Sequence, residues 1–179
     1  MSDSVLLRRI ISTAFGHFEL IGGEQGLVWV SLPGLGSNSG RDAHLERWHG
    51  GVTVRNGARA HGEAAAWVRD WVAGRFAPFK SKLAPRGTEF QQQVWAALRR
   101  VPAGKTLTYG QLAKRVNREG AARAVGSAMR KNPLPLFVPC HRVLAGGGLG
   151  GFSGGVVGAL DLKQRMLDHE GARLGPSKK

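Results

Sequence analysis

Cysteine is nearly absent from this chain, which has one Cys among 179 residues. A lone cysteine can form no intramolecular disulfide, and it excludes a zinc site with several cysteine ligands. The six histidines are scattered singly, without the spacing of metal ligands, so we expect no metal and no other cofactor. Residues 1–8 lack the long apolar core of a secretory signal. Together these features predict a cytoplasmic protein in a reducing environment.

Acidic residues and long hydrophobic runs are also scarce. No segment approaches the roughly 18 uninterrupted apolar residues of a membrane span, and no basic amphipathic helix stands out, so we expect no membrane partner. The chain has 12 Asp and Glu against 26 Lys and Arg, a formal net charge of +14. Such an excess attracts a polyanion, and nucleic acid is the commonest one inside cells. A role of this charge in solubility alone is the alternative.

Apolar residues are plentiful enough for folded domains, because 42% of the chain is hydrophobic and it includes five Trp and seven Phe. A chain of this length holds one large domain or two small ones. Proline and lysine gather at 80–87. This composition predicts a linker between a first domain at 1–79 and a second domain at 88–179.

The first domain begins with strand signals at 5–13, 18–21 and 26–32, which predict an antiparallel meander. The stretch 33–57 is rich in Gly, Ser, Asn and Arg without a clear period, so we expect a loop. A helix is predicted at 58–76, because apolar residues recur there at helical spacing. Its apolar face, which we expect to cover the sheet as ordinary core, consists of Ala64, Trp67, Val68, Trp71 and Val72.

The second domain opens on two helix starts of the same kind. Thr88 precedes Gln91 by three residues, and Thr108 precedes Gln111 in the same way, which are capping boxes. A turn at 117–120 then leads to a further helix at 121–131, which Pro133 ends. A short helix, a tight turn and a second helix form a helix-turn-helix pattern, whose second helix usually enters a DNA groove.

That second helix is built mostly from small residues, including Ala122, Gly126 and Ser127, with Arg123 and Arg130 as its long side chains. Small residues let a helix approach the DNA backbone closely, and few side chains remain to distinguish base edges. We therefore expect binding through phosphate contacts and shape, with weak sequence preference. Small residues serve helix packing equally well, so this helix alone favours neither interpretation.

The residues that suggest chemistry follow directly. An apolar run at 134–139, expected to be extended and buried, leads to Cys140, His141 and Arg142. A buried cysteine is usually inert packing, but the basic neighbours favour its thiolate and a histidine can accept its proton. Adjacent residues of an extended segment point to opposite faces, so a bridging water between the two is reasonable. Glu170, on a predicted helix at 159–171, is our choice of acid to orient the histidine.

The run Pro139-Cys140-His141-Arg142-Val143, preceded by Asn132-Pro133, resembles the active-site signature of the O6-alkylguanine-DNA alkyltransferases, also called methylated-DNA–protein-cysteine methyltransferases. The resemblance extends over residues 87–171. It implies an α/β (α+β) fold, with a small RNase H-like antiparallel sheet and covering helix before a mostly helical domain with a helix-turn-helix. It also implies direct, single-turnover repair of O6-alkylguanine in double-stranded DNA by a monomer. Activity on O4-alkylthymine and cooperative binding along DNA stay open.

The resemblance also implies roles for individual residues. Cys140 is the alkyl acceptor, His141 takes its proton through a water, and Glu170 orients that histidine. Asn132 holds the active-site turn, and Tyr109 rotates a phosphate and donates a proton to the leaving guanine. Arg123 is the finger that fills the gap left by the flipped base. The other implied DNA contacts of the same helix are Ala122, Gly126, Ser127 and Arg130. The implied base pocket consists of Val143, Leu144, Ser153 and Phe152.

Two departures from the family pattern and two other classes of function also follow from the sequence. The stretch 156–161 is longer than the family pattern, and Phe152 stands where some members have tyrosine. A non-catalytic helix-turn-helix protein that recognises damage or regulates would explain the charge, although it leaves the Pro-Cys-His-Arg run unexplained. A cysteine hydrolase or thiol redox protein would explain Cys140 and His141, but not the DNA-binding features.

Overall fold

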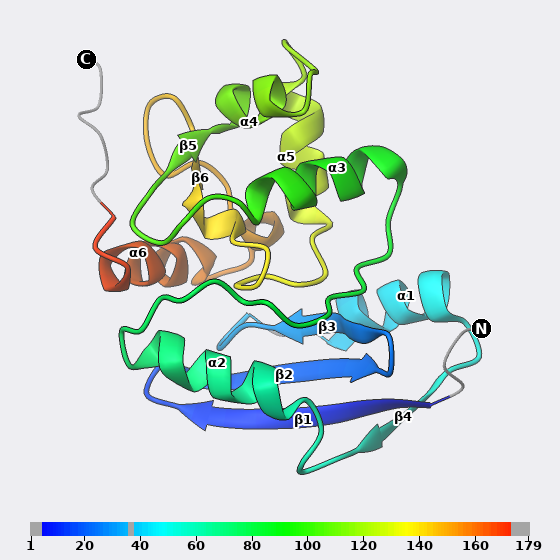
Figure 1. Cartoon of the computed structure of the whole chain (residues 1–179). Helices are drawn as coiled ribbons and strands as arrows, with labels where there is room; N and C mark the ends of the chain where they lie inside the picture. Colours follow the sequence, from blue (N-terminus) through cyan, green and yellow to red (C-terminus); the bar gives the residue numbers. More distant parts are fainter. Residues whose placement is uncertain (1–4, 36–37, 173–179) are drawn as a thin grey trace. The chain divides into compact units, whose positions relative to one another are not determined.

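The computed structural model describes residues 5–35 and 38–172. The chain divides between Gly87 and Thr88 into two compact units. The first unit contains a sheet with two helices, and the second is mostly helical (Figure 1). This architecture confirms the predicted mixed α/β fold class. None of the helices in the described ranges has the length and hydropathy needed to cross a bilayer.

The predicted meander is confirmed, with strands β1 (Val5–Thr13), β2 (Gly16–Gly23) and β3 (Gly26–Ser31) paired in antiparallel. Gly26 at the start of β3 has a φ of 125°, a value that favours glycine. A Cβ atom there would lie 2.5 Å from the carbonyl oxygen of Lys82. Leu27 donates a backbone hydrogen bond to Lys82 and accepts one from Ala84. Part of the predicted linker therefore pairs with β3.

The prediction of a loop at 33–57 is wrong, because the segment contains helix α1 (Asn38–His49) and strand β4 (Thr53–Asn56). β4 pairs in parallel with β1, so the sheet is mixed and has the order β3-β2-β1-β4. Hydrophobic periodicity missed both elements, since β4 is exposed along its length and Leu45 is the one buried apolar residue among the described side chains of α1. Leu45 packs against one face of the sheet.

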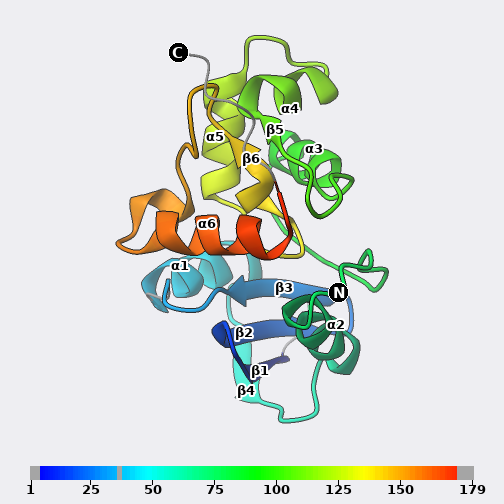
Figure 2. The same ribbon diagram turned by 90° about the vertical axis from the view of Figure 1, so that its left-hand side faces the viewer.

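The other face of the sheet is covered by α2 (Gly62–Val72), as both views show (Figures 1 and 2). The helix is shorter than the predicted 58–76 because His61 before it adopts a left-handed φ of 54°. Trp71 is fully buried and packs edge to face with Phe15, with ring centroids 5.0 Å apart. The core-facing role predicted for this helix is confirmed, and its buried residues are Ala64, Ala65, Val68 and Trp71.

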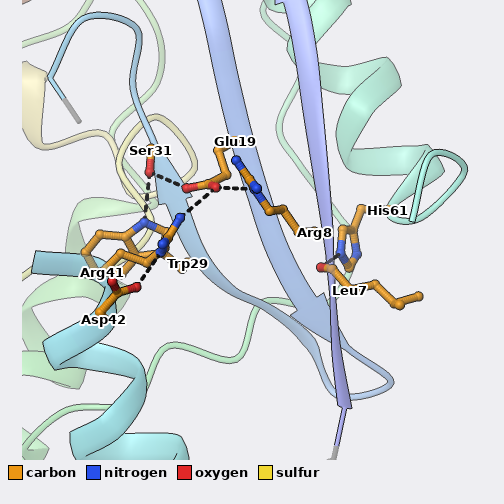
Figure 3. A network of polar contacts seen from close by, with 8 residues as sticks. All are labelled: Leu7, Arg8, Glu19, Trp29, Ser31, Arg41, Asp42 and His61. Atoms are coloured by element: carbon orange, nitrogen blue, oxygen red, sulfur yellow. Dashed lines mark hydrogen bonds and ion pairs between the residues drawn. The ribbon is translucent and has the colours of Figure 1, made fainter. Parts of the chain in front are cut away.

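A polar network joins three strands to α1 (Figure 3). Glu19 of β2 forms ion pairs with Arg8 of β1 at 2.5 Å and with Arg41 of α1 at 3.0 Å. The Ser31 hydroxyl of β3 donates a hydrogen bond to the same carboxylate at 2.9 Å, and it accepts one from the indole of Trp29. Because α1 buries little apolar surface, these polar contacts hold it on the sheet.

The pH dependence of the first unit's stability is expected to depend on His44 of α1, which packs against Trp29 with ring centroids 5.2 Å apart. Burial lowers the pKa of His44 to about 4, and nearby His49 acts in the same direction. The unfolded chain binds this proton near pH 6.5, so the folded state loses stability as pH falls from about 6.5 toward 4. Because the His44 ring is partly solvated, solvent screening reduces the full linkage effect, and we expect a loss of about 1–2 kcal/mol over this range, measured by urea unfolding followed through tryptophan fluorescence. A pH slope that is the same in His44→Phe would contradict this assignment.

The second unit contains the three predicted helices, which are α3 (Glu89–Leu98), α4 (Tyr109–Arg115) and α5 (Ala122–Arg130). Both predicted capping boxes are confirmed. The Thr88 hydroxyl accepts from the backbone N–H of Gln91, and the Gln91 side chain accepts from the backbone of Thr88. Thr108 and Gln111 repeat this exchange at the start of α4. The two helix starts are thus determined by local hydrogen bonds.

Two short parallel strands, β5 (Leu107–Thr108) and β6 (Val143–Leu144), tie the start of α4 to the segment after Cys140. This pairing was not predicted, because strands of two residues have no detectable period. Helix α6 (Ala159–His169) is the last helix in the described part of the unit. The core between these elements is apolar, and its fully buried members include Val94, Leu98, Leu112, Val125, Leu134 and Val143.

Candidate active site

The helix-turn-helix is formed by α4 and α5, joined by a turn in which Asn117 and Gly120 have φ values of 56° and 82°. α5 is bonded to α3 on its buried side, because the indole of Trp95 in α3 donates to the carbonyl of Ala128 at 3.0 Å. Its inward side contains Val125, Ala128 and Met129. The opposite side leaves Arg123, Ala124, Ser127 and Arg130 exposed.

A cavity of about 390 Å³ lies beside α5 and reaches Cys140. It brings together most of the predicted site residues, namely Tyr109, Arg123, Gly126, Ser127, Arg130, Cys140, Phe152 and Ser153. Six others do not line it, of which Asn132, His141 and Glu170 lie around the cysteine as described below. Ala122 is the half-buried first residue of α5, and Val143 and Leu144 are buried in β6, where they pair with β5. The predicted pocket wall at these two residues is therefore a strand behind the cysteine.

One rim of the cavity consists of the glycine-rich loop 151–155, which includes Phe152 and Ser153. Ser153 has a φ of 44°, and Gly154 and Gly155 follow with positive φ. Just before the rim, Gly150 allows a close contact, since a Cβ atom there would lie 2.9 Å from the backbone nitrogen of Ala145 and 3.2 Å from the ring of Tyr109. Glycine at this position lets the rim lie against Tyr109.

The segment that leads to Cys140 is a tight turn, and the prediction of an extended run at 134–139 is wrong. The amide of Asn132 donates to the carbonyl of Val138 at 2.8 Å, and its side-chain oxygen accepts from the backbone N–H of Leu134 at 3.0 Å. Leu136 has a φ of 76°, which a sequence pattern of apolar residues and prolines does not signal. The run is nevertheless buried as expected. Cys140 itself begins a short 3-10 turn, η1 (Cys140–Arg142).

Behind Cys140 lies a buried group of charged side chains. His141 Nε2 is 3.0 Å from Glu170 Oε1, and both side chains are fully buried. Arg142 contacts both oxygens of the same carboxylate, at 2.8 and 2.6 Å, and also donates to the carbonyl of Val101 at 2.5 Å. Glu170 caps the C-terminal end of α6. The structure thus places Glu170 against His141, and Arg142 completes a triad that the sequence did not reveal.

The protonation of this triad follows from its geometry. Burial alone would raise the pKa of Glu170, but hydrogen bonds from His141 and Arg142 hold that pKa well below its usual range. Burial lowers the pKa of His141, although Glu170 acts in the opposite direction. The carboxylate is therefore ionised and the imidazole neutral at pH 7. A neutral ring whose Nε2 proton points to a carboxylate has its proton acceptor at Nδ1.

Burial raises the pKa of the Cys140 thiol, and this differs from the thiolate that its basic neighbours suggested. The side chains of Asn132 and Lys163 act in the opposite direction without outweighing burial. Arg142 does not supply the expected electropositive setting, because its guanidinium is occupied by Glu170. The site therefore holds a neutral thiol at Cys140 and a neutral imidazole at the next residue, and nucleophilic attack by this thiol requires a proton acceptor.

Lys163 is a site residue that sequence reasoning missed. It lies on α6, and its side chain is fully buried between the helix and the loop before the rim. A signal was present in the sequence, since Lys163 falls four residues after Ala159 and four before Leu167, in the buried stripe of α6. A lysine in such a stripe is unusual unless its ammonium group is fully hydrogen-bonded.

The fold and site define a helix-turn-helix protein whose cavity contains a single thiol. Residues 89–172 match the family described as the DNA-binding domain of 6-O-methylguanine DNA methyltransferase. A methylated-DNA–protein-cysteine methyltransferase of Methanosarcina acetivorans is 38% identical over 165 residues, which cover 91% of this chain and 97% of that protein. The chain therefore belongs to the methylated-DNA–protein-cysteine methyltransferase family.

Solved structures agree with this assignment. The O6-methylguanine methyltransferase of Mycobacterium tuberculosis is similar with a TM-score of 0.77 and 32% identity, and the match covers 96% of each chain. A structure of the M. tuberculosis protein in complex with DNA is similar with a TM-score of 0.76 and 31% identity, over 92% of each chain. Both matches extend well beyond the helix-turn-helix, so the likeness includes the first unit.

Proposed function

We propose that this protein repairs alkylated DNA directly, by moving the alkyl group from O6 of guanine to the sulfur of Cys140 in a single turnover. The observation that carries the proposal is the cavity beside α5, which is lined by the chain's single thiol, and the residue next to that thiol is a buried histidine held by a carboxylate. A volume of about 390 Å³ lies in the range of small-molecule sites. The partner is double-stranded DNA that carries O6-alkylguanine, bound by one copy of the chain.

The chemical step is a displacement at the alkyl carbon. The sulfur of Cys140 forms a bond to this carbon as the bond from carbon to O6 breaks, and His141 takes the thiol proton through a bridging water. Burial and the nearby Cys140 raise the pKa of Tyr109, so its hydroxyl keeps a proton to donate to the departing guanine. The proton on His141 then restores Tyr109 through solvent. The product is a thioether, which no group of the site hydrolyses, and the protein is consumed.

Access to the alkyl group requires the nucleotide to leave the base stack, since O6 of a stacked guanine cannot reach a buried thiol. Arg123 is an exposed side chain of α5 at the edge of the cavity, among small neighbours. We assign to it the filling of the gap that the flipped nucleotide leaves. The other exposed residues of α5, with Gly126, contact the sugar-phosphate backbone, consistent with the net charge of +14.

The proposal is tested by incubating the protein with a duplex that carries O6-[methyl-³H]guanine. We expect label to move to the protein and to stop at one methyl group per chain, however much substrate is added. Peptide mapping should place the label on Cys140. Label that stays on the DNA, or that appears as free methanol, would show that the protein does not carry out this transfer.

Replacing Arg123 with alanine separates base flipping from the chemical step. We expect transfer from duplex DNA to slow by about tenfold, because the cost of unstacking is no longer offset. Transfer from the free base O6-methylguanine should change by less than about twofold. Arg115→Ala, which removes the same charge from α4 outside the cavity, is the matched control. Equal slowing on both substrates would argue against the assigned role.

A further inference from the structure

The side chain of Lys163 has an arrangement that the proposed chemistry does not use. Its ammonium group donates to three backbone carbonyls, those of Val143 at 2.7 Å, Leu149 at 2.5 Å and Gly151 at 3.2 Å. Val143 belongs to β6, directly after the turn that contains Cys140, and Gly151 is the first rim residue of the cavity. A single buried cation therefore connects α6, the strand behind the cysteine and the rim.

The carbonyl of Gly151 has a second donor, and that donor is Tyr109. Its hydroxyl lies 3.2 Å from the Gly151 oxygen, the same distance as the ammonium group of Lys163. A carbonyl oxygen has two lone pairs and accepts both bonds at once. If the Tyr109 hydroxyl turns toward a guanine in the cavity, the rim carbonyl keeps the bond from Lys163.

We propose that Lys163 is a positioning residue that holds the cavity rim at Gly151, so that the Tyr109 hydroxyl can leave the rim and serve the leaving guanine. The second part rests on the proposed function, because it assumes that Tyr109 donates to the base. The first part, the attachment of the rim to β6 and α6, is independent of any reaction. Without Lys163, the Tyr109 hydroxyl would leave the Gly151 carbonyl without a side-chain donor whenever it donated to the substrate.

The surroundings of Lys163 suit a structural cation. Within the described residues its hydrogen-bond partners are backbone carbonyls, and the ring of Phe152 lies 5.9 Å from Nζ. The titratable groups that face it are Cys140 and His141. Burial lowers the pKa of Lys163 to about 8, while Cys140 acts in the opposite direction. The ammonium form, with three N–H donors for three carbonyls, is thus the main form at neutral pH.

The test uses Lys163→Met, Tyr109→Phe and the double variant of the full chain. In Lys163→Met we expect amide hydrogen exchange at Leu149–Phe152 to rise by about tenfold or more, because the rim loses its attachment to α6. In Tyr109→Phe the same amides should exchange at nearly the wild-type rate, because Lys163 still holds Gly151. Increased exchange in Tyr109→Phe, or unchanged exchange in Lys163→Met, would overturn the proposal.

A kinetic cycle tests the link to Tyr109. At saturating O6-methylguanine duplex, Lys163→Met should lower the transfer rate constant by about tenfold. The loss in the double variant should be clearly smaller than the product of the two single losses, since the residues act on one carbonyl. A loss of rate constant in the double variant that equals the product of the two single losses would contradict the shared role.

Two controls keep the outcomes distinct. Affinity of Lys163→Met for undamaged duplex should stay within about twofold of wild type, which shows that the helix-turn-helix is folded. The fold of the two variants that lack the Tyr109 hydroxyl is checked by far-UV circular dichroism. If Lys163→Met does not fold, the exchange pattern of Tyr109→Phe alone decides the matter. If the wild-type protein transfers no alkyl group, the proposed function fails, while the exchange data still judge the attachment of the rim.

Discussion

Cys140→Ser is expected to abolish alkyl transfer while DNA binding stays intact. A serine hydroxyl is a far weaker nucleophile than a thiol toward an alkyl carbon, and His141 cannot deprotonate it to a useful extent. The replacement is nearly isosteric and follows directly on the buried turn, whose backbone Asn132 bonds at Leu134 and Val138. In the tritium assay we expect no label on the variant protein. Its affinity for a fluorescent duplex should equal that of wild type.

This result also separates the three classes of function that the sequence allowed. A non-catalytic helix-turn-helix protein would keep every measurable activity in Cys140→Ser. A cysteine hydrolase would turn over a small ester many times, and a thiol redox protein would form a reversible sulfenate or mixed disulfide. Met129→Leu is the matched control, because it changes an uncharged side chain of the same cavity without removing the thiol. Full transfer by Cys140→Ser would refute the proposed acceptor.

Glu170→Gln is expected to reduce both stability and transfer. The amide cannot balance the charge of Arg142, which remains buried, and removing one partner of a buried ion pair costs about 3–5 kcal/mol. It also leaves His141 without the carboxylate that orients the ring and stabilises its charged form. We expect the transfer rate constant to fall by about a hundredfold or more. A rapid-quench assay with the labelled duplex measures the transfer rate constant, and urea unfolding measures the stability.

The stability effect of Glu170 has a defined pH range. The pKa of Glu170 is far below its ordinary value of about 4.5 in the folded state, so its contribution is present above pH 4.5 and is lost as pH falls below it. The difference between wild type and Glu170→Gln should therefore shrink in acid. Asp168→Asn on the same helix removes an exposed carboxylate that contacts Gln164, and serves as control. Equal losses in both variants would contradict a specific role for Glu170.

The sequence predicted those parts of the fold that depend on local signals. Thr88 and Thr108 start helices through bonds to residues three positions on, so their capping boxes could be recognised without the structure. The same holds for the three antiparallel strands and for α2, whose apolar residues keep a regular period. For the site, the adjacency of Cys140 and His141 was visible in the sequence, and Glu170 was one of a few acids available in the second unit.

The features that were missed depend on contacts between distant segments. α1 is held by Arg41 on Glu19 and by Leu45, and a polar helix of this kind carries no periodic signal. The turn before Cys140 depends on Asn132 and on the positive φ of Leu136, which apolar composition does not reveal. Lys163 was not singled out from the sequence, because its three partners are backbone carbonyls that no sequence pattern identifies.

Gly126 stands in the middle of α5, at a position where the fold itself does not require glycine. A Cβ atom there would make an ordinary contact of 3.8 Å with the ring of Tyr109, so packing does not demand glycine. Alanine would favour the helix by about 1 kcal/mol. The chain therefore has a weak helix former at a position where internal packing would also accept alanine. If DNA binds as proposed, the missing side chain lets the DNA backbone approach α5 more closely at this point than an alanine would allow.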